Sequence, residues 1–129
     1  MATPTIILVP VHLISLLEAA KRLLAHAGRA LSLTMLVMRP PTEYLAAEIE
    51  DHVRREEAFG LDVRFVHLPA MDHSMDFTGI EEFVSRFVQV HAPHVRVAIS
   101  RSTSPVAAVV LDFFCTTLID VCRDLAVPA

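Results

Sequence analysis

The chain has 129 residues, a length typical of one domain, and its hydrophobic content of 53% excludes a disordered polypeptide. Its formal net charge is −4 and its basic residues are scattered, so we expect no nucleic-acid partner. No apolar run approaches the roughly 20 residues of a membrane helix, and Pro10 and His12 interrupt the N-terminal apolar stretch, so neither a membrane span nor a secretory signal is expected. Cys115 and Cys122 form no disulfide framework, which makes a reducing, cytoplasmic location the default.

Hydrophobic patterning predicts four strands that alternate with four helices. Short apolar runs rich in β-branched residues predict strands at residues 5–9, 30–38, 63–67 and 106–111. Apolar residues at three- and four-residue spacing predict helices that begin near Ser15, Thr42, Thr78 and Cys115. Such alternation predicts an α/β fold, a Rossmann-like parallel sheet with helices on both faces.

The start of the first helix is predicted from a capping-box pattern. Ser15 with Glu18 has the spacing of that motif, which would start the helix after Ser15 and leave His12 in the preceding loop. Gly28 is a plausible stop for the same helix, because glycine accepts the left-handed conformation that follows a helix end.

Later helix boundaries depend on two threonines and one proline. Thr42 is expected to cap the second helix, and Thr78 with Glu81 forms a capping box for the third. Pro93 is expected to kink or split the third helix near His91, since proline removes a backbone hydrogen bond from a helix interior.

The carboxyl edge of this sheet is the expected ligand site. Rossmann-type sheets have the strand order 3-2-1-4, which makes the first and fourth strands neighbours and places the topological switch point between them. His12 follows the first strand and Asp112 ends the fourth. We therefore predict that these two residues lie together where open parallel sheets bind ligands.

His12 and Asp112 have two interpretations. As a catalytic pair, the carboxylate would fix the imidazole tautomer while the other ring nitrogen takes a proton from a substrate. Alternatively, His12 is an ordinary loop histidine and Asp112 caps the next helix. Spacing alone leaves both interpretations open.

Other reactive side chains give weaker signals. Cys115 and Cys122 lie on an apolar helical stripe, which is typical of buried structural thiols. His91 and His94 have a metal-ligand spacing, but Pro93 lies between them and no third ligand is evident, so no metal is expected. The chain has three glycines and no Gly-rich phosphate loop, so no cofactor-binding residues are predicted.

Several segments resemble one known family. They read VPVHLISLLEAAKRLLAHAG, PPTEYLA, HAPHV and AVVLDFFCTTLIDVCRDLAVPA, and they are similar to the N-terminal half of plant UDP-dependent glycosyltransferases. The resemblance implies a truncated GT-B fold, in which residues 1–129 are a single acceptor-side Rossmann-like domain. It also implies that His12 is the general base on a small hydroxylated acceptor, such as a phenolic aglycone in plant secondary metabolism, and that Asp112 is its partner. The implied reaction is an inverting, metal-free sugar transfer from a UDP-sugar.

The sequence departs from the family pattern in two ways. Only Val11 separates Pro10 from His12, where family members usually have several residues including a glycine. His12 is therefore expected to be displaced from the position that the catalytic histidine has in the family. The resemblance covers only the acceptor side, so the donor-binding C-terminal domain is expected to be absent and a UDP-sugar to bind only if that domain were supplied.

These departures keep other functions open. The main alternative is an inactive fragment that at most binds an acceptor or associates with a full-length relative, and an unrelated flavodoxin-like binding module is a third. Another strand would be expected to begin at 127–129. Without that neighbour, the apolar run 106–111 would be an exposed edge prone to self-association.

Overall fold

The computed structural model describes residues 3–71 and 79–129, which form one parallel sheet with helices. Its strands have the order β3-β2-β1-β4. They are β1 (Thr5–Val9), β2 (Ser32–Val37), β3 (Val63–His67) and β4 (Val106–Leu111). β1 pairs in parallel with both β2 and β4, so the predicted order and the predicted contact of the first and fourth strands are confirmed.

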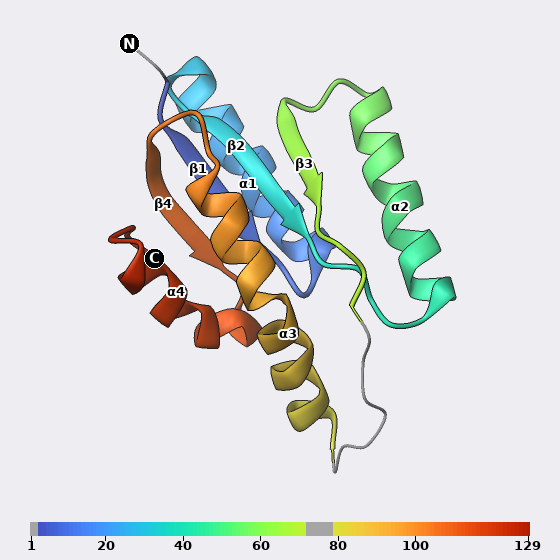
Figure 1. Cartoon of the computed structure of the whole chain (residues 1–129). Coiled ribbons are helices and arrows are strands. Elements are labelled where there is room, and N and C mark those ends of the chain that lie inside the picture. The colour runs from blue at the N-terminus through green and yellow to red at the C-terminus, as the bar shows by residue number, and fades with distance from the viewer. Residues whose placement is uncertain (1–2, 72–78) are drawn as a thin grey trace.

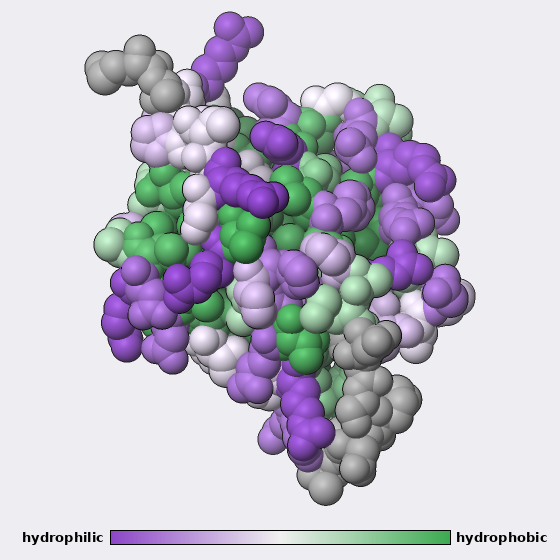
Figure 2. Space-filling model, in the orientation of Figure 1, coloured by the Kyte–Doolittle hydropathy of each residue, from purple (hydrophilic) through white to green (hydrophobic). Residues whose placement is uncertain are grey.

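Helices cover both faces of the sheet (Figure 1). They are α1 (Leu13–Ala27), α2 (Glu43–Ala58), α3 (Ile80–Ser100) and α4 (Ile119–Asp124). Because side chains alternate along a strand, Leu8 of β1 packs with α1 while Ile7 and Val9 pack with α3. The face that carries α3 and α4 is seen in Figure 2, where hydrophilic and hydrophobic side chains are mixed.

Helix α1 begins earlier than predicted. His12 is its N-cap residue and Leu13 its first helical residue, so the predicted start after Ser15 is wrong. Leu13 and Leu17 lie one turn apart and are both buried in the core. Burial of Leu13 therefore favours the earlier start over the local Ser15–Glu18 capping box.

The predicted start of the second helix is correct, whereas the predicted bounds of the second strand are not. The Thr42 cap of α2 is confirmed, because its Oγ1 accepts a hydrogen bond from the Leu45 N–H at 3.3 Å. The second strand is shorter than predicted, since a 3-10 turn at Gly28–Ala30 precedes Ser32–Val37. Thr78 lies outside the described residues.

Helix α3 is not split at Pro93, so of the two predicted outcomes, a kink or a split, the split is wrong. The helix continues from Ile80 to Ser100. Val95 and Ile99, which follow the proline, are buried against the sheet, and their packing outweighs the loss of one backbone hydrogen bond. None of the helices in residues 3–71 and 79–129 is long and apolar enough to cross a membrane.

The C-terminal residues lie along the outer edge of β4. The Val109 N–H donates a hydrogen bond to the Pro128 carbonyl oxygen at 2.8 Å, and Val127 packs against the core beside α3. The outer edge of β4, which was predicted to be exposed, is therefore paired at its centre with the C-terminal residues through one backbone hydrogen bond.

Candidate functional site

The connection between β1 and α1 is a turn of three residues, 10–12. β1 ends at Val9 and α1 begins at Leu13, so Pro10, Val11 and His12 form the whole connection. Pro10 is buried, while His12 is exposed and has extended backbone angles. The turn therefore holds His12 at the carboxyl edge of the sheet, directly before a helix.

Asp112 follows β4 and binds three main-chain N–H groups with its carboxylate. Oδ2 accepts hydrogen bonds from Val11 N at 3.2 Å and from His12 N at 2.9 Å. Oδ1 accepts a hydrogen bond from Phe114 N at 3.1 Å, which caps the 3-10 turn Phe113–Leu118. Hydrogen bonds to a charged acceptor are stronger than neutral ones. Asp112 thus ties the turn that carries His12 to the end of β4.

The structure brings the two predicted site residues together through the main chain. Among the described residues, no hydrogen bond joins the His12 imidazole to the Asp112 carboxylate. The imidazole lies against the Phe114 ring, with centroids 5.2 Å apart and an interplanar angle of 38°. The alternative role of Asp112 as a cap is present in the structure, and the catalytic roles of His12 and Asp112 stay predictions.

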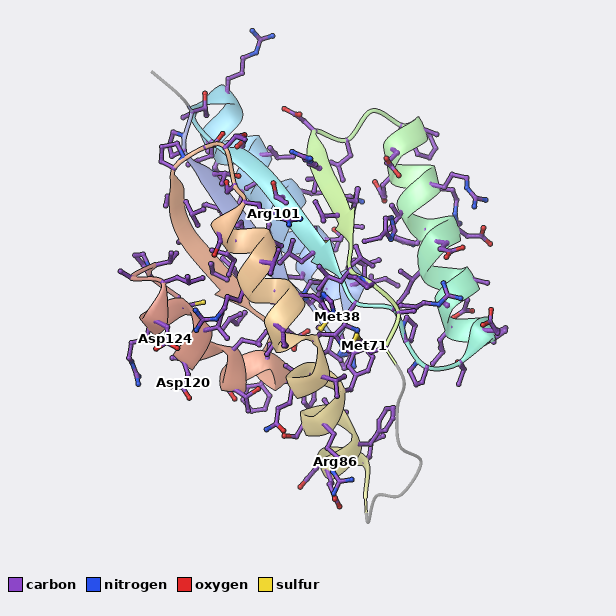
Figure 3. The ribbon with its side chains drawn as sticks, viewed as in Figure 1. Met38, Met71, Arg86, Arg101, Asp120 and Asp124 are labelled. Atoms are coloured by element: carbon purple, nitrogen blue, oxygen red, sulfur yellow. The ribbon has the colours of Figure 1, made fainter. Side chains whose placement is uncertain are left out.

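Two exposed phenylalanine rings follow Asp112, and the ring of Phe114 contacts His12. Phe113 is 84% exposed and Phe114 is 43% exposed, and their rings meet edge to face at 5.6 Å. We call Phe113 and Phe114 the aromatic shelf. Met38 and Met71 lie at the same edge of the sheet (Figure 3). Exposed aromatic side chains at a ligand-binding edge suit a flat, apolar molecule, and sequence reasoning missed this surface.

The other candidate side chains do not join the site. Burial, together with the nearby Asp112 carboxylate, raises the pKa of the Cys115 thiol to about 12, so this thiol stays protonated and is no nucleophile. Cys122 is also buried and free, as predicted. His91 is buried and its Nδ1 lies 2.7 Å from the Phe87 carbonyl oxygen. Within the described part of the chain, no three potential ligands gather around a metal position.

Curated relatives of the chain are plant glycosyltransferases, although no family model matches it. The chain is 49% identical over 133 residues to malvidin galactosylase UGT88C3 of Oryza sativa subsp. indica, covering 99% of this chain and 28% of that protein. It is 31% identical over 126 residues to a putative UDP-glucose flavonoid 3-O-glucosyltransferase 3 of Fragaria ananassa, covering 92% of this chain and 26% of that protein. The chain thus spans about a quarter of the length of these relatives.

Solved structures of plant glycosyltransferases share the fold. UGT2 of Phytolacca americana superposes with a TM-score of 0.78 at 26% identity, over 97% of this chain and 28% of that one. A second solved structure is a Polygonum tinctorium UDP-glucosyltransferase capable of glucosylating indoxyl, in complex with 3,4-dichloroaniline. It superposes with a TM-score of 0.75 at 29% identity, over 98% of this chain and 29% of that one. Over nearly its whole length, this chain is similar in sequence and in fold to the N-terminal part of plant UDP-glycosyltransferases.

The predicted fold class is confirmed by this family. The parallel sheet with helices on both faces matches the N-terminal part of solved UDP-glycosyltransferases over nearly the whole of this chain. In this chain, the β1–α1 turn and the end of β4 meet at the switch point of the sheet.

Proposed function

We propose that this chain is the acceptor-binding part of a plant UDP-glycosyltransferase, with His12 as general base and Asp112 as its positioning residue. The reaction would transfer a sugar from a UDP-sugar to a hydroxyl of a small phenolic acceptor, with inversion at the anomeric carbon. The observation that carries the proposal is the 2.9 Å hydrogen bond from His12 N to Asp112 Oδ2 at the switch point.

In the proposed mechanism, His12 removes the acceptor proton. Its imidazole nitrogen takes the proton of the acceptor hydroxyl, and the resulting alkoxide-like oxygen forms a bond to the anomeric carbon. The bond from that carbon to UDP breaks, and UDP leaves with the electron pair. A positioned general base typically contributes a factor of about 10² to 10⁴ in rate.

Asp112 would support His12 in two ways. Its hydrogen bonds to Val11 N and His12 N fix the main chain of the turn. Its negative charge would also favour the imidazolium that forms when His12 takes the proton. Pairing of the two side chains themselves is part of the proposal.

The aromatic shelf would bind the acceptor. Phe113 is 84% exposed and therefore free to pack against a phenolic ring close to His12. Relatives named for malvidin and flavonoid substrates are consistent with such a ring.

The donor side of the reaction is proposed to lie outside this domain. We propose that residues 1–129 are a single acceptor-side domain and that a separate donor-binding domain would have to supply the UDP-sugar site. A second candidate function is acceptor binding without transfer. The three-residue turn 10–12 favours it, because a small displacement of a catalytic base costs a large factor in rate.

Acceptor binding can be tested by two-dimensional amide NMR with a panel of phenolic aglycones. We expect shifts at the amides of Val11, His12 and Phe114. Phe113→Ala should weaken binding about fivefold or more, because one aromatic contact is lost. Phe59→Ala is the matched control, since Phe59 is 86% exposed and follows the far end of α2. No saturable shift with any aglycone would refute both candidate functions.

Transfer can then be tested with UDP-glucose and the aglycone that binds best. If the chain is a transferase, His12→Ala should lower turnover by about 10² to 10⁴ while acceptor shifts persist. Asp112→Asn should also reduce turnover. Acceptor binding with no turnover by the unmodified chain would support the second candidate, and turnover that survives both substitutions would refute the assigned pair.

A further inference from the structure

A cleft of about 550 Å³ opens on the α3 face of the sheet. Its floor is formed by β2 and β3, one wall is the second half of α3, and residues 102–104 close one end. Its lining does not include His12, Asp112 or Phe114, so it is distinct from the site proposed above. The volume lies within the range of about 300–1,000 Å³ typical of small-molecule sites.

The two faces of β2 and β3 differ in polarity. On the face that packs with α1 and α2, Leu33 and Met35 of β2 are buried. On the cleft face, the alternate positions start polar, with Ser32 and Thr34 of β2 and Arg64 of β3, and end apolar with Leu36 and Val66. Strands of a parallel sheet that are covered on both faces are apolar on both faces. The polar side chains therefore show that no apolar layer covers this end of the face, and they suit a polar ligand.

Two guanidinium groups, those of Arg64 and Arg101, line the cleft. Within residues 3–71 and 79–129, neither Arg64 nor Arg101 forms a salt bridge, whereas Arg39 and Arg96 are both paired with carboxylates. Arg101 follows the last residue of α3 (Figure 3), and it lines the cleft together with residues of β2 and β3. In the lining that the structure describes, Asp62 supplies the one carboxylate, so the lining has a surplus positive charge in a chain of net charge −4. The charge of the cleft suits an anion.

Hydroxyl groups and a short apolar strip complete the lining. Residues 102–104 are all hydroxyl-bearing, and the Ser102 hydroxyl donates to the Ser104 carbonyl oxygen at 2.8 Å, which orders this segment. Leu36 and Val66 form the apolar strip on the floor. The C–H face of a sugar can pack on such a strip while its hydroxyls bond to the rim and its acidic group meets the guanidinium groups.

We propose that this cleft binds a small polyhydroxylated anion, with Arg64 and Arg101 holding its acidic group. Phosphate and carboxylate groups share the geometry that a guanidinium recognises, so a sugar phosphate and a sugar acid are both members of the class. The site is independent of the acceptor site at His12.

The test is an amide NMR titration of the 129-residue chain with glucose 6-phosphate, glucuronate, inorganic phosphate and glucose. We expect saturable shifts at Arg64 and at residues 101–104 with glucose 6-phosphate or glucuronate. Comparison of these two ligands distinguishes a phosphate from a carboxylate. Inorganic phosphate should bind more weakly than the preferred sugar anion, and neutral glucose should give no saturable shift. The absence of saturable shifts at about 10 mM, well above a millimolar Kd, would overturn the proposal.

Charge-removing variants identify the residues responsible. Arg64→Gln and Arg101→Gln should each weaken binding about tenfold, because each removes a charge-assisted hydrogen bond. Arg22→Gln is the matched control, since Arg22 is exposed on α1 at the opposite face and forms no ion pair among the described residues. Equal weakening by Arg22→Gln would mean non-specific attraction and would overturn the proposal. Because aglycone shifts at Phe114 are measured separately, failure here is distinguishable from failure of the acceptor site.

Discussion

Removal of the Asp112 carboxylate should loosen the turn that carries His12. Asp112→Ala removes hydrogen bonds from Val11 N at 3.2 Å, His12 N at 2.9 Å and Phe114 N at 3.1 Å. The bond to Val11 is partly buried, so its N–H loses an acceptor that water replaces poorly. The other two bonds are exposed, and water can replace the carboxylate there.

The magnitude follows from this difference in exposure. A hydrogen bond to a charged group contributes about 1.5–3 kcal/mol, and an exposed capping carboxylate about 1 kcal/mol. We therefore expect Asp112→Ala to lower the free energy of unfolding by about 2–3 kcal/mol. Asp112→Asn should cost about 1 kcal/mol, because its amide oxygen still accepts from Val11 and His12 while its NH₂ group opposes the Phe114 N–H.

Urea denaturation followed by circular dichroism measures both changes. Asp120→Ala is the control, since the Asp120 carboxylate is 80% exposed and pairs at the surface with Arg123. That substitution should change the free energy of unfolding by less than about 0.5 kcal/mol. If Asp112→Ala costs no more than Asp120→Ala, the carboxylate does not hold the turn, and the positioning role proposed for it fails.

Two further predictions concern buried side chains. His91→Ala should lower the free energy of unfolding by about 3 kcal/mol, because it leaves a cavity beside Phe87 and removes the Nδ1 hydrogen bond, whereas His94→Ala should cost less than about 1 kcal/mol. Equal effects in urea denaturation would contradict this. Burial raises the pKa of the Cys115 thiol from 9.0 to about 12, so its contribution to stability is complete below pH 9 and is lost as the pH rises to about 12. Urea midpoints at increasing pH should fall less in Cys115→Ser than in the unmodified chain, and an equal fall would refute the assignment.

The strands were the most predictable part of the fold. The bounds of β1, β3 and β4 are those that the apolar runs predict. The helix start after Ser15 and the split at Pro93 were both wrong, and for the same reason. Each relied on a local backbone rule, at Ser15 or at Pro93, and in each case burial of neighbouring apolar side chains was stronger.

The candidate site was predictable only at the level of topology. Strand order brings the ends of β1 and β4 together, and with them His12 and Asp112. Which donor the carboxylate binds is decided by local geometry, and the main-chain N–H groups of Val11 and His12 compete with the imidazole for it. The exposure of Phe113 could not be predicted, since an apolar residue after a strand usually joins the core.

The position of β1 in the sheet also sets the order in which the protein can fold. β2 follows β1 after one helix, but Asp112 is synthesised 100 positions after the His12 whose main chain it binds. Contacts between such distant residues close late, because the intervening chain must first be ordered. During synthesis on the ribosome, one edge of β1 therefore stays unpaired until β4 emerges. The edge of the sheet that carries the proposed catalytic residues therefore forms late. Until then, the unpaired edge of β1 is the place where a newly made chain can pair with a wrong strand.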